Sequence, residues 1–324
     1  MLEQLFPLLE QNYRFSARGL KLLGGYYNHV YETADGTLVV KLFRFDRDDP
    51  RRVLSELHWM RHLHEQGVPV ASPIAARNGE WIARLNERYF VSVTTKLEGK
   101  AIDPKDESVW NDSFFHRWGA TMGRIHSAGK DFQSLQDEEL PDWSDETIVR
   151  IGDPSGSNTL VDTELDAVVA AKWSEAVERL RGFQRDEARF GLIHHDMHLD
   201  NLMLCNHGLA VLDFGDSLQH WFVYDAAIAV FFAALTIDSQ EQQARSEFAA
   251  RFLHSFAEGY ESVHVLPAEE WRHIPFFLWY RQLYSYLYHH IHKPPHQRTE
   301  RETVILNLMR ERIIHEVPVV QLPR

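Results

Sequence analysis

IHHDMHLDNLMLCNHGLAVLDFGD, residues 193–216, is the stretch of sequence that decides the fold. Two short apolar runs within it, 202–205 and 209–212, are separated by a turn sequence and predict a β-hairpin. Asn201 and Asp213 flank this hairpin, so we expect them to be cross-strand neighbours at its open end. An amide oxygen and a carboxylate brought together are hard ligands of the kind that Mg²⁺ binds.

A third polar side chain, Asp196, lies on the loop that leads into the predicted hairpin. A carboxylate at this place can accept a hydrogen bond from an incoming hydroxyl group and take its proton. Phosphoryl transfer has a loose transition state, so the protein contributes mainly by positioning the reactants and neutralising charge. A base, two metal ligands and a cation are most of the catalytic groups that it has to supply. The stretch therefore predicts phosphoryl-transfer chemistry, with the cation still to be found.

We predict that cation at Lys41, in the middle of the apolar strand 37–43, where a lone ammonium group would be costly without an anionic partner. Glu56 supplies the partner, because it shares a helical face with apolar side chains of the following helix (Val53, Met60 and Leu63). Kinases present an ammonium to nucleotide phosphates in this way. An ordinary ion pair, or a lysine that reaches water at a strand edge, would leave the same pattern.

The patterns outward from these residues predict a small sheet followed by a mostly helical region. The predicted strands are 20–23, 30–33, 37–43, 80–85 and 89–95. A main helix is predicted from Asp49 to about Gln66. Beyond a plausible hinge at 97–99, the predicted helices are 113–127, 162–185, 226–235, 240–260 and 271–292. We therefore expect an α+β protein with two domains, 1–95 and 96–324.

Composition and charge exclude several classes of function. The chain of 324 residues has a formal net charge of -13, which argues against a nucleic-acid partner; the acidity is compatible with a cationic substrate but more often reflects solubility. Its single cysteine, Cys205, excludes an internal disulfide framework. The longest apolar run, 226–235, is about half of what a membrane span needs, and the N-terminus lacks a signal-peptide pattern. We expect a cytoplasmic protein with no nucleic-acid and no membrane partner.

The quoted stretch resembles two motifs of a known family. Residues 193–201 are similar to the "hGDlHpgN" catalytic loop of aminoglycoside phosphotransferase-like kinases, which include homoserine, choline and bacterial stress-response kinases. Residues 211–216 are similar to the family's "viDfgd" metal motif. Further matches, to the first hairpin, the phosphate lysine and the "yDla" segment, lie at 24–31, 39–41 and 224–227. The matches run in the family's order over roughly residues 15–290, which is more specific than any single motif.

The resemblance implies a two-lobed protein-kinase-like fold, with a small N-terminal antiparallel sheet lobe that carries one main helix and a larger, mostly helical C-terminal lobe. It implies Asp196 as catalytic base, with Asn201 and Asp213 as Mg²⁺ ligands. It also implies Lys41 as the phosphate ligand of ATP and Glu56 as its orienter. The other nucleotide-binding residues that it implies are Gly24, Gly25, Asn28, Thr95 and Leu97, and it gives Asp225 a structural role.

The sequence departs from the family pattern at several places. His195 and Asp200 stand where the family commonly has glycine, which changes the backbone and the charge near the substrate but removes no catalytic atom. The first hairpin carries Gly24-Gly25 without a GxGxxG pattern, so its glycine signal alone is weak. The segment 258–260 resembles a recurrent "eGY" of the family, which we interpret as structural.

Two interpretations from other classes compete with a kinase. The histidines around Asp196, namely His194, His195 and His198, could form a transition-metal site, although no helical pair of ligands at i and i+4 accompanies them. We therefore expect no tightly bound zinc or iron. A nucleotide-binding regulator without turnover would be favoured by the loss of a catalytic residue, but the lysine and both aspartates are present.

A Ser/Thr protein kinase of the stress-response type is the rival within the enzymes. Protein kinases interpose a long activation segment after the metal-binding aspartate, ending in Ala-Pro-Glu. Asp225 follows Asp213 by only 12 positions, and no Ala-Pro-Glu comes after it. We therefore favour transfer to a hydroxyl of a small molecule, such as an amino alcohol, a hydroxy-amino acid or an aminoglycoside-like compound. The sequence leaves the acceptor open, and also the choice between ATP and GTP.

Aromatic residues of the late helix are the candidates for the acceptor side. Phe277, Tyr280, Tyr284 and Tyr288 follow helical spacing, which most often means core packing and less often an aromatic wall over a ligand. Aromatic rings together with excess acid could hold an amine or a quaternary ammonium group.

Overall fold

The structure is a computed structural model that describes residues 5–24, 29–132, 140–149, 167–206, 208–238, 241–293 and 295–322. The chain divides into two compact units, and each is described by itself. The first unit comprises Met1–Ile102, Asp131–Leu140 and Asp200–Asp216, and the second comprises Asp103–Lys130, Pro141–Leu199 and Ser217–Arg324. The domain boundary after residue 95 stays a prediction, and no local pattern indicated that 200–216 belongs with the N-terminal residues.

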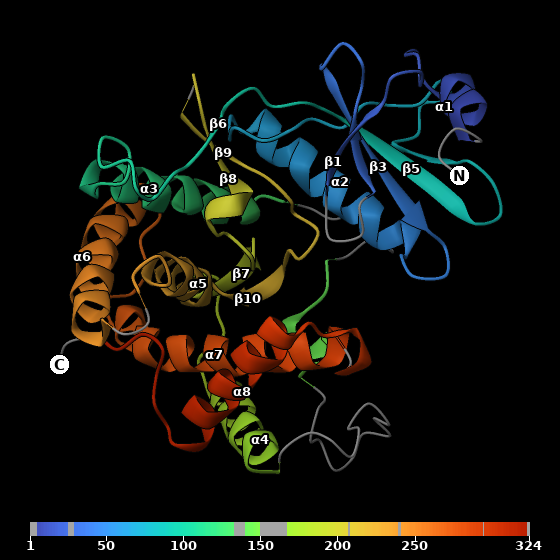
Figure 1. The fold of residues 1–324 in the computed structure, drawn as a ribbon. Coiled ribbons are helices and arrows are strands. Elements are labelled where there is room, and N and C mark those ends of the chain that lie inside the picture. Colours follow the sequence, from blue (N-terminus) through green and yellow to red (C-terminus); the bar gives the residue numbers. More distant parts are fainter. Residues whose placement is uncertain are drawn as a thin grey trace. The chain divides into compact units, whose positions relative to one another are not determined.

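The first unit is built on a five-stranded antiparallel sheet (Figure 1). In spatial order its strands are β1 (Lys21–Gly24), β2 (Val30–Glu32), β3 (Leu38–Arg44), β5 (Tyr89–Thr95) and β4 (Ile82–Arg84). Side chains alternate between the two faces of a strand. In β3, Val40 and Leu42 enter the core that also receives Leu9 of helix α1 (Phe6–Asn12), so Lys41 points to the opposite face.

Helix α2 (Pro50–Glu65) lies on the face to which Lys41 points. Its start is fixed locally, because the Asp49 side chain accepts a hydrogen bond from the Arg51 amide at 2.9 Å and Pro50 occupies the first turn. The predicted apolar face of this helix is buried, and Glu56 is buried with it. The sequence prediction of a main helix over this segment is therefore confirmed.

The predicted hairpin is formed by β8 (Leu202–Cys205) and β9 (Gly208–Val211), and β6 (Lys100–Ala101) pairs with β8. Leu202 pairs with Val211, so the next residue opposite Asn201 is Leu212, whose amide donates to the Asn201 carbonyl at 2.9 Å. The predicted direct pairing of Asn201 with Asp213 is thus wrong by one residue. The cause is that β9 begins one residue earlier than its apolar run.

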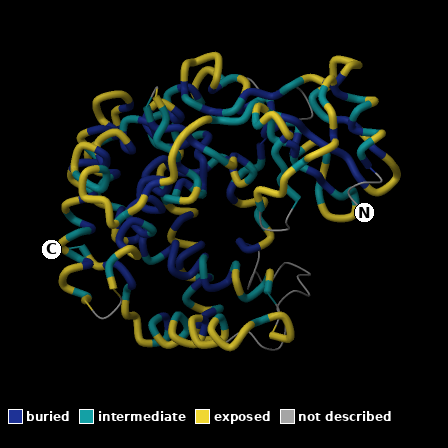
Figure 2. The backbone as a smooth tube through the Cα atoms, turned by 45° about the horizontal axis from the view of Figure 1, so that its top comes forward, coloured by how far each residue is buried: buried dark blue, intermediate teal, exposed yellow. Residues whose placement is uncertain are grey.

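The second unit is mostly helical and contains one small two-stranded sheet (Figure 1). Its helices are α3 (Asp112–Gly129), α4 (Ala167–Arg181), α5 (Phe222–Ala234), α6 (Gln242–Glu261), α7 (Ile274–His292) and α8 (Glu300–Ile314). Its strands are β7 (Phe190–Ile193) and β10 (Leu218–Trp221), which pair antiparallel. Helix α5 is buried on nearly every side and forms the centre of the unit, and Figure 2 shows the buried residues inside each unit. The predicted α+β architecture is confirmed, and none of the described helices is long and apolar enough to span a membrane.

Several elements escaped the sequence analysis, among them β6, which has only 2 residues. Helix α1 has only 7 residues, and the mixed composition of β10 shows neither period clearly. Helix α8 did carry a usable signal, because Thr299 and Glu302 form a capping box at its start. The predicted helix 162–185 lies partly outside the described residues, which begin again at 167.

Helices α3 and α6 cross so closely that two glycines are required at the contact. A Cβ atom on Gly259 would lie 1.9 Å from the carbonyl oxygen of His116, and one on Gly119 would lie 1.9 Å from that of Phe256. Real side chains never approach a backbone oxygen so closely. The structural role inferred for 258–260 therefore has a physical reason, which is the approach of two backbones.

We predict that Gly259→Ala destabilises the protein by at least about 2 kcal/mol, because overpacking at this crossing outweighs the better helix propensity of alanine. Chemical denaturation followed by circular dichroism measures the change. The control is Glu258→Ala at the exposed neighbouring position, which should have little effect. Equal stabilities of the two variants would contradict the tight crossing.

Candidate active site

The first group of predicted site residues surrounds the ammonium of Lys41. Its Nζ atom lies 3.6 Å from Glu56 Oε1 and 3.1 Å from Asp213 Oδ1. The exposed fractions of the three side chains are 33% for Lys41, 10% for Glu56 and 60% for Asp213. The strand, the helix and the segment after β9 thus each contribute one charged group. Glu56 forms the sheltered end of this row of charges, and Asp213 forms the end that solvent reaches.

The pKa values of these charged groups depend on how far each is buried and on the charges beside it. Burial alone would lower the pKa of Lys41, but the charges of Glu56 and Asp213 outweigh it and raise that pKa above its ordinary value. Burial raises the pKa of Glu56, and the charge of Lys41 opposes that shift. Lys41 is therefore a permanent cation whose charge is shared between two carboxylates.

The segment that carries Asp213 is held in place by α2 and by its own backbone. Asp213 has φ 54°, in the left-handed region, which turns the chain directly after the hairpin. Arg52 donates from Nη2 to the carbonyl oxygen of Gly215 at 3.0 Å. Arg52 was missed in the sequence analysis, because nothing in its neighbourhood indicates a partner 163 positions away.

The second group of predicted site residues lies on the loop after β7, in the second unit, and Asp225 of α5 organises it. Asp225 accepts backbone hydrogen bonds from His194 at 3.0 Å and from His195 at 2.9 Å. His126 of α3 lies 3.1 Å from the same carboxylate and 2.7 Å from the Tyr260 hydroxyl. Burial lowers the pKa of His126, so the neutral ring donates to Asp225 and accepts from Tyr260. One buried carboxylate thereby fixes the loop to three helices.

Asp196 is bound on both of its oxygens. Arg281 of α7 donates from Nη2 to Oδ1 at 3.1 Å, and Nε2 of His198 lies 3.2 Å from Oδ2. Burial alone would raise the pKa of Asp196, but the hydrogen bond from His198 and the charge of Arg281 outweigh it and bring that pKa to about 2. Asp196 is therefore a carboxylate throughout the physiological pH range and can accept a hydrogen bond from a hydroxyl group.

His195 occupies the position where glycine was expected, and it has a backbone that glycine would favour. Its φ is 70°, in the left-handed region, which costs a non-glycine residue about 1 kcal/mol. The ring is buried, with Tyr284 and Tyr224 at ring-centroid distances of 5.3 and 5.6 Å. Burial and the charge of Arg281 lower the pKa of His195 to about 3, so the ring is neutral. Among the described residues, no three His, Cys, Asp or Glu side chains are placed to hold one metal ion together.

The remaining predicted site residues lie on the sheet or outside the described residues. Gly24 ends β1 at a bulge with φ 130°, a conformation that favours glycine. Thr95 ends β5, and its hydroxyl accepts a hydrogen bond from the Ser72 amide at 2.9 Å. Leu97 follows that strand and is half-buried. Gly25 and Asn28 lie outside the described residues.

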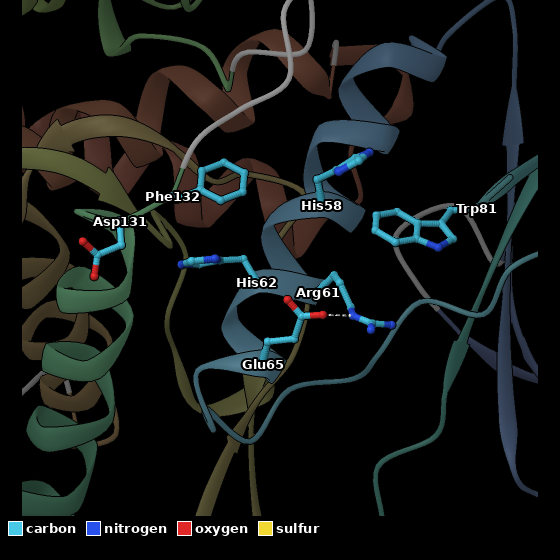
Figure 3. A pocket seen from close by; sticks show the side chains of 7 residues that line it. All are labelled: His58, Arg61, His62, Glu65, Trp81, Asp131 and Phe132. Atoms are coloured by element: carbon cyan, nitrogen blue, oxygen red, sulfur yellow. Dashed lines mark hydrogen bonds and ion pairs between the residues drawn. The ribbon is translucent and has the colours of Figure 1, made fainter. Parts of the chain in front are cut away.

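A pocket of about 510 Å³ opens beside α2 (Figure 3). Its lining residues are His58, Arg61, His62, Glu65, Trp81, Asp131 and Phe132. Arg61 and Glu65 neutralise each other at 2.6 Å, and no predicted site residue contributes to the lining. The catalytic residues are therefore not assigned to this pocket.

Comparisons with known proteins identify the family and the fold of the chain. A family model described as the phosphotransferase enzyme family matches residues 19–266. Amicoumacin kinase of Bacillus subtilis (strain 168) is 25% identical over 288 residues, covering 88% of this chain and 83% of its own. A homoserine kinase of Neisseria meningitidis serogroup B is 27% identical over 250 residues, covering 76% and 74%. An amicoumacin kinase solved with AMP-PNP, Ca²⁺ and Ami superposes with a TM-score of 0.85 at 22% identity, covering 99% and 95%, which shows the fold.

We predict that Asp225→Asn destabilises the protein by about 3 kcal/mol, because an amide cannot accept both backbone amides and also pair with His126. Thermal and chemical unfolding measure the loss. The matched control is Asp112→Asn, at an exposed aspartate of α3, which should unfold like the wild type. A stability of Asp225→Asn equal to that of the control would contradict the role of Asp225 in holding the loop.

Proposed function

Because the chain is a kinase that belongs to the phosphotransferase enzyme family, we propose that it transfers the γ-phosphoryl group of magnesium-bound ATP to a hydroxyl group of a small molecule. The observation that carries the proposal is the ammonium of Lys41 between the carboxylates of Glu56 and Asp213. A cation held in place from its buried side can neutralise phosphate charge without reorganising during the reaction.

In this proposal Asp196 is the catalytic base. The acceptor oxygen forms a bond to the γ-phosphorus while the bond from that phosphorus to the bridging oxygen of ADP breaks, and the proton of the hydroxyl passes to Asp196. The low pKa of Asp196 makes it a weak base, so we expect it mainly to orient the hydroxyl until the loose transition state has formed. Lys41 would contact the phosphates that stay with ADP, with Glu56 as its orienter.

Asn201 and Asp213 would hold the metal. Their fit rests on the donor set, one amide oxygen and one carboxylate that solvent reaches, which leaves the remaining positions of an octahedral ion to water and phosphate oxygens. When bound, Mg²⁺ supplies charge neutralisation of the nucleotide phosphates. Gly24, Gly25, Asn28, Thr95 and Leu97 would contact the nucleotide, and GTP as the donor is an outcome of the same assays.

A small-molecule acceptor is favoured over a protein by the short segment between Asp213 and Asp225. That segment contains β10, which pairs with β7 inside the second unit, and has no room for a peptide-binding platform. Two of the relatives support the same choice by their names, amicoumacin kinase and homoserine kinase, while another is named stress response kinase A. We propose an amino alcohol, a hydroxy-amino acid or an aminoglycoside-like compound as the acceptor.

The deciding experiment measures ADP release and identifies the product by mass spectrometry, over a panel of amino alcohols, hydroxy-amino acids, sugars, aminoglycosides and generic protein substrates. We expect turnover on a member of the small-molecule panel. Turnover on proteins alone would favour a protein kinase of the stress-response type. Nucleotide binding without any turnover would favour a regulator.

We predict that Asp196→Asn lowers kcat at least about 100-fold while nucleotide affinity stays within twofold of wild type, because the variant loses the acceptor of the hydroxyl proton. Steady-state kinetics and isothermal titration calorimetry measure the two effects. The matched control is Asp131→Asn, in the pocket beside α2, which should keep wild-type kcat. Full activity of Asp196→Asn would refute its assignment as the base.

We also predict that Lys41→Met lowers kcat/KM for ATP about 100-fold, since the phosphates lose their cation and Glu56 is left without its partner. The control is Lys21→Met, at an exposed lysine of the same sheet that pairs with Glu32, which should behave like the wild type. If both variants had wild-type kinetics, Lys41 would be an ordinary ion-pair lysine.

A further inference from the structure

Arg281 is a buried cation that the sequence analysis did not single out. It lies on α7, where its side chain is only 8% exposed. Its Nη2 donates to Asp196 Oδ1 at 3.1 Å, and its Nη1 donates to the carbonyl oxygen of His195 at 3.4 Å. One guanidinium group therefore binds both the carboxylate of Asp196 and the peptide group directly before it.

The surroundings of Arg281 indicate which group compensates its charge. The rings of Phe232 and Tyr284 lie 4.9 and 5.3 Å from its Cζ atom. The titratable groups that interact with its charge include Asp196 and His195 on the loop, Tyr224 on α5, and Tyr280, Tyr284 and His289 on α7 itself. Only Asp196 among these carries a negative charge at neutral pH. A buried guanidinium is costly without an anion, so the two charges depend on each other.

The contact of Arg281 with Oδ1 also determines which oxygen of Asp196 faces the hydroxyl group of an acceptor. Oδ1 is bound by the buried guanidinium of Arg281 at 3.1 Å. Oδ2 lies 3.2 Å from Nε2 of the partly exposed His198, whose ring contacts that of Phe232 at a tilted angle with a centroid distance of 5.0 Å. A carboxylate held on one oxygen by a buried cation keeps a defined orientation. Its other oxygen then also has a defined direction, and it can accept a second hydrogen bond beside the contact with His198.

We propose that Arg281 is a positioning residue of the phosphoryl transfer, which holds Asp196 through Oδ1 and the His195 carbonyl so that Oδ2 receives the acceptor hydroxyl. The proposal rests on the proposed function and adds to it a residue and a direction of approach. A general base must lie within hydrogen-bond reach of the proton that it abstracts, and displacement by about 1 Å costs on the order of 100-fold in rate.

Two substitutions and one control test the role by kinetics. Arg281→Met should lower kcat about 100-fold and leave KM for ATP within twofold of wild type. Arg281→Lys should have a kcat about tenfold higher than that of Arg281→Met. An ammonium keeps the charge but cannot bind both Asp196 Oδ1 and the His195 carbonyl oxygen in the same geometry. The control is Arg189→Met, at a partly buried arginine of the same unit that pairs with Asp186, Glu269 and Glu270, which should keep wild-type kcat in the folded fraction.

A second measurement does not depend on activity. The midpoint of chemical unfolding is compared for wild type, Arg281→Met, Asp196→Asn and the double variant. If the two charges depend on each other, Arg281→Met should lower the midpoint less in the Asp196→Asn background than in wild type. Additive shifts would contradict the pairing, and a wild-type kcat in Arg281→Met would contradict the positioning role. A wild type that turns over no acceptor would instead contradict the proposed function.

Discussion

The interaction on which the first unit depends is the ion pair of Lys41 with two carboxylates. A strand that sends Val40 and Leu42 into a core must send Lys41 to the other face, and there the ammonium needs compensation. Glu56 of α2 supplies the compensating negative charge, and this contact fixes the helix to the sheet. Asp213, in the segment after the hairpin, supplies a second negative charge. This contact fixes residues 200–216 to the N-terminal residues, although the two segments are distant in sequence. The same charges that join these elements form the phosphate side of the proposed site.

In the second unit the charge that needs compensation is an anion, the carboxylate of Asp225. Asp225 lies at the centre of the unit on a helix that is buried on nearly every side, and its charge is met by two backbone amides and by His126. Several hydrogen bonds to the ionised form outweigh the cost of burying it, so its pKa stays below the ordinary value. In both units a buried carboxylate, Glu56 or Asp225, joins elements of the fold through its partners.

Local patterns predicted the elements that carry the site, and they failed where the information is not local. The face of α2, the strand of Lys41 and the β8–β9 hairpin follow from periodicity and turn residues within a few positions. The register of the hairpin was wrong by one residue, because apolar runs do not fix the point at which a ladder begins. Arg52 and Arg281 were missed because their partners lie 163 and 85 positions away, and a charged residue gives no indication in the sequence of where such a distant partner is.

His195 shows how such non-local contacts permit a departure from the family pattern. A side chain at a left-handed position costs about 1 kcal/mol, which glycine would avoid. The amide of His195 donates to Asp225 and its carbonyl accepts from Arg281, so ionised side chains from two helices hold both peptide groups of the residue. Charge-assisted hydrogen bonds of this kind are worth about 1.5–3 kcal/mol each, enough to offset the strain. The histidine is tolerated because the backbone around it is fixed by α5 and α7, so the direction of Asp196 does not require a glycine beside it.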